Sequence, residues 1–127
     1  MSQIKGKNTK PEIIVRKHLF AERFRYRLHD KSLPGNPDVI LKKIKTVIFI
    51  NGCFWHGHQN CKYFKIPKTR TEWWTEKINK TIDNDTIAKT RLESLGWKVI
   101  IVWECDLKNR KVETLDHLVK SLRASNI

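Results

Sequence analysis

The sequence predicts an α/β fold, with a small mixed sheet flanked by helices in a single domain of 127 residues. An unbroken apolar run at 45–50, KTVIFI, is typical of a strand that is buried on both faces. A helical pattern covers about 71–94 and ends at Gly96, a favoured residue just beyond a helix end. The segment 97–104, WKVIIVWE, indicates another strand. A strand, a helix and a strand in this order form a βαβ unit with parallel strands and a right-handed crossover.

The other elements follow from start signals and periodicity. Thr9 and Glu12 have the spacing of a capping box, which predicts that a helix begins at Thr9. Thr69 and Thr71 are candidate caps of the long helix, and a hairpin around Lys42–Lys45 would join two strands. We expect a flexible basic arm at 1–8, a helix at 9–22, a strand at 24–30, a turn at 32–38, a strand at 38–43 and a last helix at 113–125.

The net charge of the chain points to a polyanionic partner. Lysine and arginine number 26 against 13 acidic residues, which gives +13 at neutral pH and a pI near 9.9. Such a basic balance favours nucleic acid, while a basic surface without a specific partner is the alternative. No apolar run reaches the length of a membrane span, and the N-terminus lacks the apolar centre of a signal peptide, so we expect a cytoplasmic protein. An odd number of cysteines, three, favours reduced thiols or metal ligands over disulfides.

A metal site is predicted at the ends of the two parallel strands. Cys53 and Cys105 lie just beyond these strands, and parallel neighbours end at the same edge of a sheet. His58 and Cys61 follow on the loop after Cys53, completing a Cys3His set of the kind that binds structural zinc. The alternative is three buried free cysteines. His56 is another candidate ligand, although two residues apart on an extended loop it would face away from His58.

Three carboxylates and one histidine are candidates for hydrolysis. Asp38 begins a strand, Glu12 lies on the first helix and Asp85 on the long helix, so the three could hold a hard cation. His56 could act as the base, with Asp85 orienting its ring. Each also has a plain interpretation: Glu12 as part of the capping box, Asp38 as a turn residue and Asp85 as a solvated helix carboxylate.

Adjacent aromatic residues form two pairs, Phe54-Trp55 on a loop and Trp73-Trp74 at the start of a helix. One interpretation places most of these rings in the core. The other is a wedge inserted between base pairs, which unstacks a step for a few kcal/mol and bends the duplex. Exposed rings of this kind would favour mismatched DNA, where unstacking is cheapest.

These residues carry a resemblance to a known family. The blocks NTKPE, YRLHDKSLPGNPD, FINGCFWHGH, KTRTEWW and LGWKVIIVWEC, in this order from Met1 to about Cys105, resemble the very short patch repair endonucleases. Members of that family nick DNA beside a T·G mismatch. The resemblance implies a restriction-endonuclease-like fold, which agrees with the topology predicted from the residues.

The resemblance also implies roles in hydrolysis. Asp38 matches a magnesium-binding aspartate, and the main-chain carbonyl of Ile50 matches the second protein ligand of Mg2+. Glu12 matches a glutamate that holds water at the metal. His56 matches the histidine that assists the attacking water, and Asp85 its carboxylate partner.

The resemblance also implies which residues bind zinc and which rings contact DNA. The zinc ligands correspond to Cys53, His58, Cys61 and Cys105, with one extra residue between the middle two. The intercalating rings correspond to Phe54, Trp55 and Trp74. Asn51 stands where the family usually has a second active-site histidine, and an amide cannot exchange protons near neutral pH. The chain also begins late relative to the family, which predicts weaker intercalation from the minor-groove side.

The resulting hypothesis is a monomeric, zinc-stabilised DNA mismatch endonuclease that uses Mg2+ and acts on double-stranded DNA with a T·G mismatch. The resemblance implies a bacterial, nucleoid-associated protein with a functional link to a DNA cytosine methyltransferase and to mismatch-repair proteins. One alternative is a related restriction or homing-type nuclease that cuts undamaged DNA. The other is a catalytically weak, zinc-stabilised DNA-binding protein, an alternative that the asparagine at position 51 supports.

Overall fold

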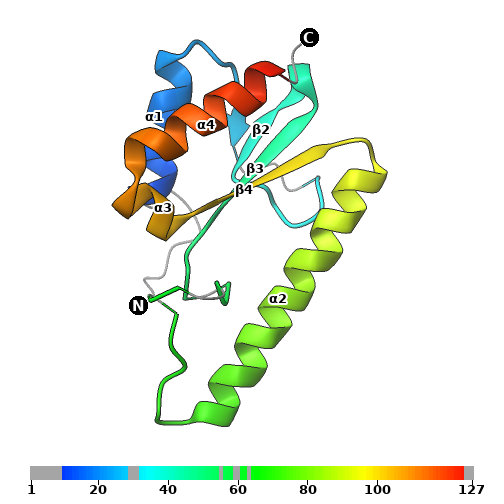
Figure 1. The fold of residues 1–127 in the computed structure, drawn as a ribbon. Coiled ribbons are helices and arrows are strands. Elements are labelled where there is room, and N and C mark those ends of the chain that lie inside the picture. Colours follow the sequence, from blue (N-terminus) through cyan, green and yellow to red (C-terminus); the bar gives the residue numbers. More distant parts are fainter. Residues whose placement is uncertain (1–9, 29–31, 55, 59–60, 63, 125–127) are drawn as a thin grey trace.

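A computed structural model describes residues 10–28, 32–54, 56–58, 61–62 and 64–124, and these residues form one mixed sheet with helices on both faces (Figure 1). The predicted fold class is therefore confirmed. Among the described residues, no helix combines the length and the apolar sequence that crossing a bilayer requires. The elements are α1 (Lys10–Ala21), β1 (Arg27–Leu28), β2 (Val39–Leu41), a 3₁₀ turn η1 (Lys42–Ile44), β3 (Thr46–Asn51), α2 (Thr71–Ser94), β4 (Lys98–Trp103), α3 (Glu104–Asn109) and α4 (Lys111–Ala124).

The sheet runs in the order β1-β2-β3-β4. The first three strands pair antiparallel, whereas β3 and β4 pair parallel from Thr46–Lys98 to Asn51–Trp103. The βαβ unit predicted from the sequence is thus present. Because the last residues of β3 and β4 are register partners, the chain leaves both strands at the same edge of the sheet. That edge, with the start of β2 beside it, carries the candidate site.

Each face of the sheet has its own apolar core. Helices α1, α3 and α4 cover one face, where α1 contributes Val15 and Leu19 and α4 contributes three leucine side chains. On the other face Leu92, near the end of α2, packs on Ile40 and Val47. The N-terminal half of α2 extends away from the sheet (Figure 1). This helix therefore reaches beyond the core to the region of the candidate site.

The end of α2 is set by Gly96, as the sequence predicts. Gly96 has φ +93°, its N–H donates to the Glu93 carbonyl at 3.0 Å, and the Trp97 N–H donates to the Leu92 carbonyl at 3.0 Å. This pair of bonds is the Schellman motif, in which a left-handed residue lets the last carbonyls find partners. The predicted caps at the other end are wrong. Arg70 is the N-cap, and the Thr71 hydroxyl donates to the carbonyls of two preceding residues, both at 3.0 Å.

The short elements differ most from the sequence prediction. Of the strand expected at 24–30, residues 29 and 30 lie outside the described part of the chain, and among residues 24–28 only Arg27–Leu28 form a strand. Strand β2 ends at Leu41 because a 3₁₀ turn closes the hairpin. That turn ends on Lys45, whose φ of 52° directs its N–H to the Lys42 carbonyl at 3.1 Å. The arm at 1–8 and the Thr9 cap lie outside the described residues.

Helix α3 was not predicted at all. Its six residues, ECDLKN, are too short and polar to show a helical period, and the burial of Leu107 anchors them to the core. Cys105 accordingly lies in the first turn of α3 rather than at the end of a strand. The last helix begins at Lys111, two residues before the predicted start, and is described to Ala124.

Candidate active site and metal cluster

The described residues of the loop after β3, 52–54 and 56–58, contain two turns. Within it the His56 N–H donates to the Gly52 carbonyl at 3.2 Å and the His58 N–H donates to the Cys53 carbonyl at 3.0 Å. Gly57 has φ +59°, and a Cβ at this position would lie 2.7 Å from Ile82 Cδ1 and 2.9 Å from Ile78 Cγ2. Only glycine allows both this backbone conformation and this close approach. The loop is therefore seated directly against α2.

Seating the loop on α2 brings His56 to Asp85. Nδ1 of His56 lies 2.6 Å from Oδ2 of Asp85, with side-chain exposures of 27% and 40%. A carboxylate only accepts hydrogen bonds, so Nδ1 carries the proton in this pair and Nε2 is the unprotonated nitrogen of the neutral ring. Such an arrangement orients a histidine whose Nε2 can accept a proton.

Asp38 lies at the start of β2, beside the end of β3. Its Oδ2 accepts a hydrogen bond from the Ile50 N–H at 2.7 Å. Burial raises the pKa of Asp38 to about 6, and the negative charge of Glu12 adds to this rise. The Ile50 N–H and His56 act on the pKa of Asp38 in the opposite direction. Glu12 and His56 therefore both lie near enough to Asp38 to act on its pKa, and their roles at a metal stay predictions.

The pair Asp38 and Glu12 has the chemistry of a hard-cation site. Glu12 is only 3% exposed although it lies on the first turn of α1. A carboxyl group whose pKa is raised by burial, with a second carboxyl group near it, is stabilised in its charged form by a divalent cation with oxygen ligands. These residues therefore fit Mg2+. The Ile50 main chain contacts Asp38 through its N–H, and the ligand role of its carbonyl stays a prediction.

Asn51 is the last residue of β3 and is 5% exposed. It lines a cavity of about 270 Å3 together with Asp85, Asn84 and Lys89. The structure thus places Asn51 near the His56–Asp85 pair, and its role in the reaction stays a prediction.

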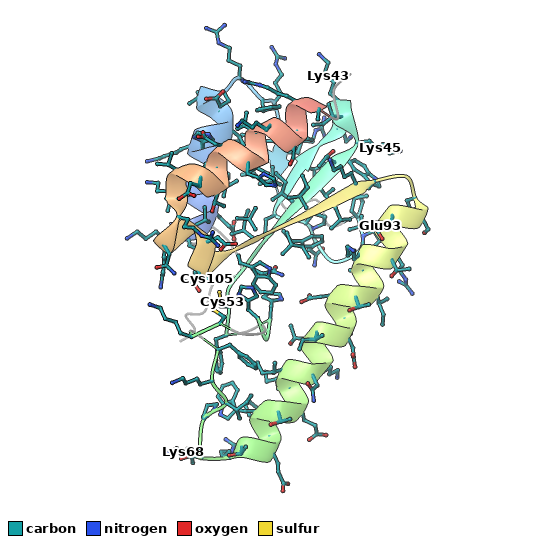
Figure 2. The ribbon with its side chains drawn as sticks, viewed as in Figure 1. Lys43, Lys45, Cys53, Lys68, Glu93 and Cys105 are labelled. Carbon is teal, nitrogen blue, oxygen red and sulfur yellow. The ribbon has the colours of Figure 1, made fainter. Side chains whose placement is uncertain are left out.

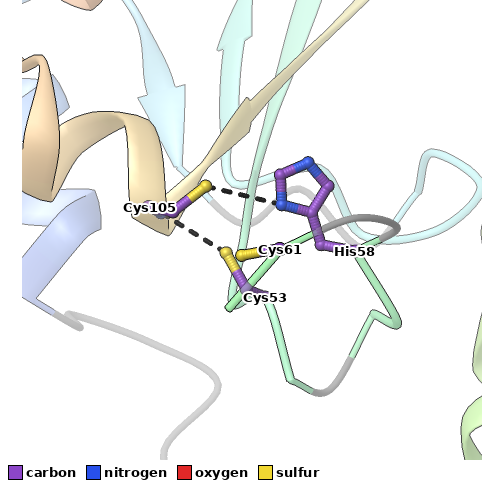
Figure 3. Close-up of side chains that lie close together, drawn as sticks. All are labelled: Cys53, His58, Cys61 and Cys105. Carbon is purple, nitrogen blue, oxygen red and sulfur yellow. Dashed lines mark hydrogen bonds between the residues drawn. The ribbon is translucent and has the colours of Figure 1, made fainter. Parts of the chain in front are cut away.

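The other half of the site is the thiol and imidazole cluster (Figure 3). The ligand atoms of Cys53, His58, Cys61 and Cys105 all lie within 4.8 Å of one another. Nδ1 of His58 is 3.4 Å from Sγ of Cys105, and the Cys105 N–H donates to Sγ of Cys53 at 3.3 Å. The predicted meeting of Cys53 with Cys105 is therefore confirmed, and His58 is the histidine that joins them. His56 turns instead to α2, because the loop is a series of turns and not the extended segment expected.

The donor set fits zinc. Three sulfur atoms and one imidazole nitrogen, packed closely enough to share one ion, are a structural zinc set. Burial raises the pKa of Cys53 to about 12 and also raises the pKa of Cys105. When a metal ion binds, it stabilises the thiolate form of such buried cysteines, so the thiols release their protons.

One contact at the cluster escaped the sequence analysis. The His58 ring stacks on Trp103 with 3.9 Å between ring centroids and 5° between planes. Trp103 ends β4 two residues before Cys105, so its ring reaches the cluster from the same strand end. The only signal in the sequence was this spacing, which does not reveal which side the ring faces.

Comparison with known proteins decides the family. Residues 1–62 match the family described as DNA mismatch endonuclease Vsr. The type II nicking enzyme V.NmeAIP of Neisseria meningitidis serogroup A is 50% identical over 125 residues, covering 97% of this chain and 89% of the relative. The chain belongs to the Vsr family of DNA endonucleases.

Two further relatives agree. The type II nicking enzyme V.XorIIP of Xanthomonas oryzae pv. oryzae is 41% identical over 109 residues, covering 86% of this chain and 79% of the relative. The DNA mismatch endonuclease Vsr of Escherichia coli K12 is 48% identical over 97 residues, covering 76% of this chain and 62% of that relative. As a Vsr-family endonuclease, the chain acts on the phosphodiester bonds of DNA.

The aromatic residues of this Vsr-family chain gather between the loop and the start of α2. The Phe54 and Trp74 rings meet edge to face with centroids 5.3 Å apart, and Trp74 meets Trp73 in the same way at 4.8 Å. Phe64 joins the cluster 6.4 Å from Phe54. Trp55 lies outside the described residues. Trp73, which is not among the rings that the family resemblance assigns to intercalation, is the exposed member at 43%.

Proposed function

We propose that this Vsr-family endonuclease nicks one strand of duplex DNA by Mg2+-dependent hydrolysis centred on Asp38. The observation that carries the proposal is the meeting, at one edge of the sheet, of a buried carboxyl group with the His56–Asp85 pair. One group supplies a ligand for a cation, and the other supplies an oriented base. Both are needed for water to attack a phosphodiester.

Each residue then has a defined task. Asp38 and the Ile50 carbonyl hold the cation, which would polarise the scissile phosphate and stabilise its added charge. Nε2 of His56 accepts a proton from the attacking water while Asp85 holds the Nδ1–H and stabilises the positive ring. Glu12 holds water beside Asp38. Asn51 contributes hydrogen bonds without exchanging a proton.

The cluster of Cys53, His58, Cys61 and Cys105 is proposed to hold a structural zinc ion. With all four positions occupied by protein, such a site leaves no place for substrate. Its ligands come from the loop and from α3, so the ion would tie the loop to the sheet. The zinc therefore supports catalysis only by holding the loop that carries His56.

For the substrate, we propose a defined short sequence in undamaged duplex DNA. Two of the relatives, which cover 97% and 86% of this chain, are named type II nicking enzymes. A T·G mismatch is the second candidate, since the matched family is described as a mismatch endonuclease. The ring cluster of Phe54, Trp73 and Trp74 supports it, because exposed aromatic side chains can enter a weakened base step.

The test is strand nicking by purified, zinc-loaded protein with Mg2+. Duplexes of one sequence with a T·A pair or a T·G mismatch at each position of a library are compared by denaturing gels. Sequence-dependent nicking of fully paired DNA supports the first substrate, and nicking restricted to T·G supports the second. Absence of nicking on all duplexes would contradict the proposed hydrolysis and favour a DNA-binding role.

A further inference from the structure

A basic groove lies at the end of the sheet away from the candidate site. Its cavity measures about 550 Å3 and is lined by residues 22–27 and 40–44 with Arg123. Six of these residues carry a positive charge, and Glu22 is the single acidic one: the cations are Arg23, Arg25, Arg27, Lys42, Lys43 and Arg123. We call this surface the far-end groove.

Most of this charge is uncompensated. Arg123 Nη2 contacts Glu22 Oε1 at 2.7 Å, which neutralises the one carboxylate. Within the part of the chain that the structure describes, the side chains of the other five cations have no hydrogen-bond or ion-pair partner, and all five are exposed. Like charges gathered in this way repel one another, so an unsatisfied cationic cluster favours binding of an anion.

The topology separates the groove from the site. Asp38 precedes β2 and Lys42 follows it, so the strand places them at opposite ends, about 13 Å apart along the chain. Arg25 lies beside the same far end, because Arg27 pairs with Ile40 in the antiparallel register. Figure 2 shows Lys43 at the opposite end of the sheet from Cys53 and Cys105. The aromatic cluster lies farther still, beyond the site.

We propose that the far-end groove binds the phosphate backbone of a second segment of duplex DNA, separate from the segment at the candidate site. A duplex seated on Asp38 and the aromatic cluster lies at one end of the sheet, whereas the groove opens at the other. The protein therefore holds two DNA segments at once and passes from one to the other without first becoming free.

DNA is favoured over an acidic protein by the kind of groups present. The cations are long and exposed, and they lie between α1 and β1, on β1, on η1 and near the end of α4. Flexible cationic side chains can contact a regular row of phosphates without a fixed hydrogen-bond geometry. Release of the counterions from the DNA favours this binding. The aromatic residues that line the groove, Phe24 and Tyr26, pack against the core. They therefore offer little apolar surface to a protein partner.

The experiment measures how a bound duplex is released. Protein is loaded on a short fluorescent duplex without added Mg2+, so that no strand is cut. It is then mixed with rising concentrations of the same duplex unlabelled. Direct transfer makes the release rate rise in proportion to competitor concentration, because the second duplex enters before the first leaves. Simple dissociation makes the rate independent of competitor.

Two triple variants locate the effect. Arg25→Gln, Lys42→Gln and Lys43→Gln remove three charges from the groove. Lys17→Gln, Lys111→Gln and Lys120→Gln remove three exposed charges from α1 and α4 as a matched control. We expect the competitor dependence to fall about fivefold or more in the groove variant and to change little in the control, since each lost phosphate contact weakens binding. Thermal unfolding checks that both variants fold.

Three results would overturn the proposal. The first is a release rate of the unmodified protein that ignores competitor, and the second is an equal response of the two variants. The third is groove-dependent binding of poly-glutamate with no transfer between duplexes, which would assign the groove to an acidic protein. Nicking is measured separately with Mg2+, so a failure of the proposed hydrolysis is distinguishable from a failure of the groove.

Discussion

Two groups of candidate metal ligands lie at one edge of the sheet, and they differ in almost every physical respect. The Cys3His cluster is made of soft ligands whose atoms lie within 4.8 Å of one another. The group around Asp38 is made of hard oxygen ligands and is bordered by the half-exposed His56–Asp85 pair. Both meet at the end of β3, since Cys53 follows this strand and Asp38 accepts a hydrogen bond from the Ile50 N–H within it.

The difference shows how one strand end supports two tasks. A closed set of four protein ligands favours a metal that only holds the chain together. An incomplete oxygen set beside an oriented histidine favours a metal that also meets substrate. The residues 52–58 connect the two, because Cys53 and His58 belong to the cluster while His56 belongs to the acidic group. Disturbing one group should therefore affect stability and disturbing the other should affect chemistry.

The largest effect is expected from breaking the cluster. Cys105→Ser should lower zinc content from one ion per chain to near zero and reduce the free energy of unfolding by about 3 kcal/mol or more, because metal binding contributes directly to folding. Zinc assay and thermal unfolding measure both. Lys108→Gln in the same helix is the control. Unchanged unfolding after both substitution and chelation would show that the cluster does not hold a structural metal.

Next in size is the loss of the proposed Mg2+ ligand. Asp38→Asn should reduce single-turnover nicking by about 10³-fold, equivalent to about 4 kcal/mol of transition-state stabilisation, with zinc content unchanged. Asp83→Asn, an exposed carboxylate on α2, should have no effect. If Asp38→Asn retains nicking activity, the cation is not bound by Asp38.

The histidine pair should behave as one unit. His56→Ala is expected to slow nicking by about 10²–10⁴-fold through loss of the base, and Asp85→Asn by about 10²-fold through loss of ring orientation. Groups that act together are not additive, so the double variant should be little slower than His56→Ala alone. Multiplication of the two effects would mean that the 2.6 Å contact has no part in the reaction.

A smaller effect concerns stability and pH. The pKa of Asp38 is raised from 3.8 to about 6, so the folded chain retains this proton between those values while the unfolded chain releases it. The contribution of this group to the free energy of unfolding therefore falls as pH rises through about 6. Without divalent ions at pH 7.5, Asp38→Asn should unfold at a higher temperature than the unmodified protein. The free energy of unfolding should be larger by up to about 2–3 kcal/mol.

The same comparison below about pH 3 should show little difference, since Asp38 is then neutral in both states. Added Mg2+ should raise the unfolding temperature of the unmodified protein alone at pH 7.5. An Asp38→Asn protein that is less stable than the unmodified protein at pH 7.5 would contradict the buried, strained carboxylate.

The smallest effect is expected at the stacked ring. Trp103→Leu should weaken zinc retention by about tenfold, because groups that orient a ligand tune the affinity of the site. Competition with a chromophoric chelator measures this. Trp97→Leu, at the other end of β4, is the matched control. Equal zinc loss in both variants would indicate general destabilisation and not the contact with His58.

Local patterns in the chain were sufficient for the long elements. The apolar run at 45–50, the helical period at 71–94 and the glycine at 96 each depend on neighbouring residues, and each prediction is confirmed. The Cys53–Cys105 meeting was also predictable, because parallel strands constrain where their ends lie. The family resemblance added roles for individual residues, and those roles stay predictions.

Local residue patterns were enough to predict the βαβ unit, the charge and the candidate metal ligands, because periodicity and residue chemistry are local properties. Packing of the folded chain determined the short elements, the direction of His56 and the stacking of His58 on Trp103. It also decided the raised pKa of Asp38 and the gathering of cations in the far-end groove. These features depend on contacts between residues far apart in the chain, and such contacts form only when the sheet and its helices pack.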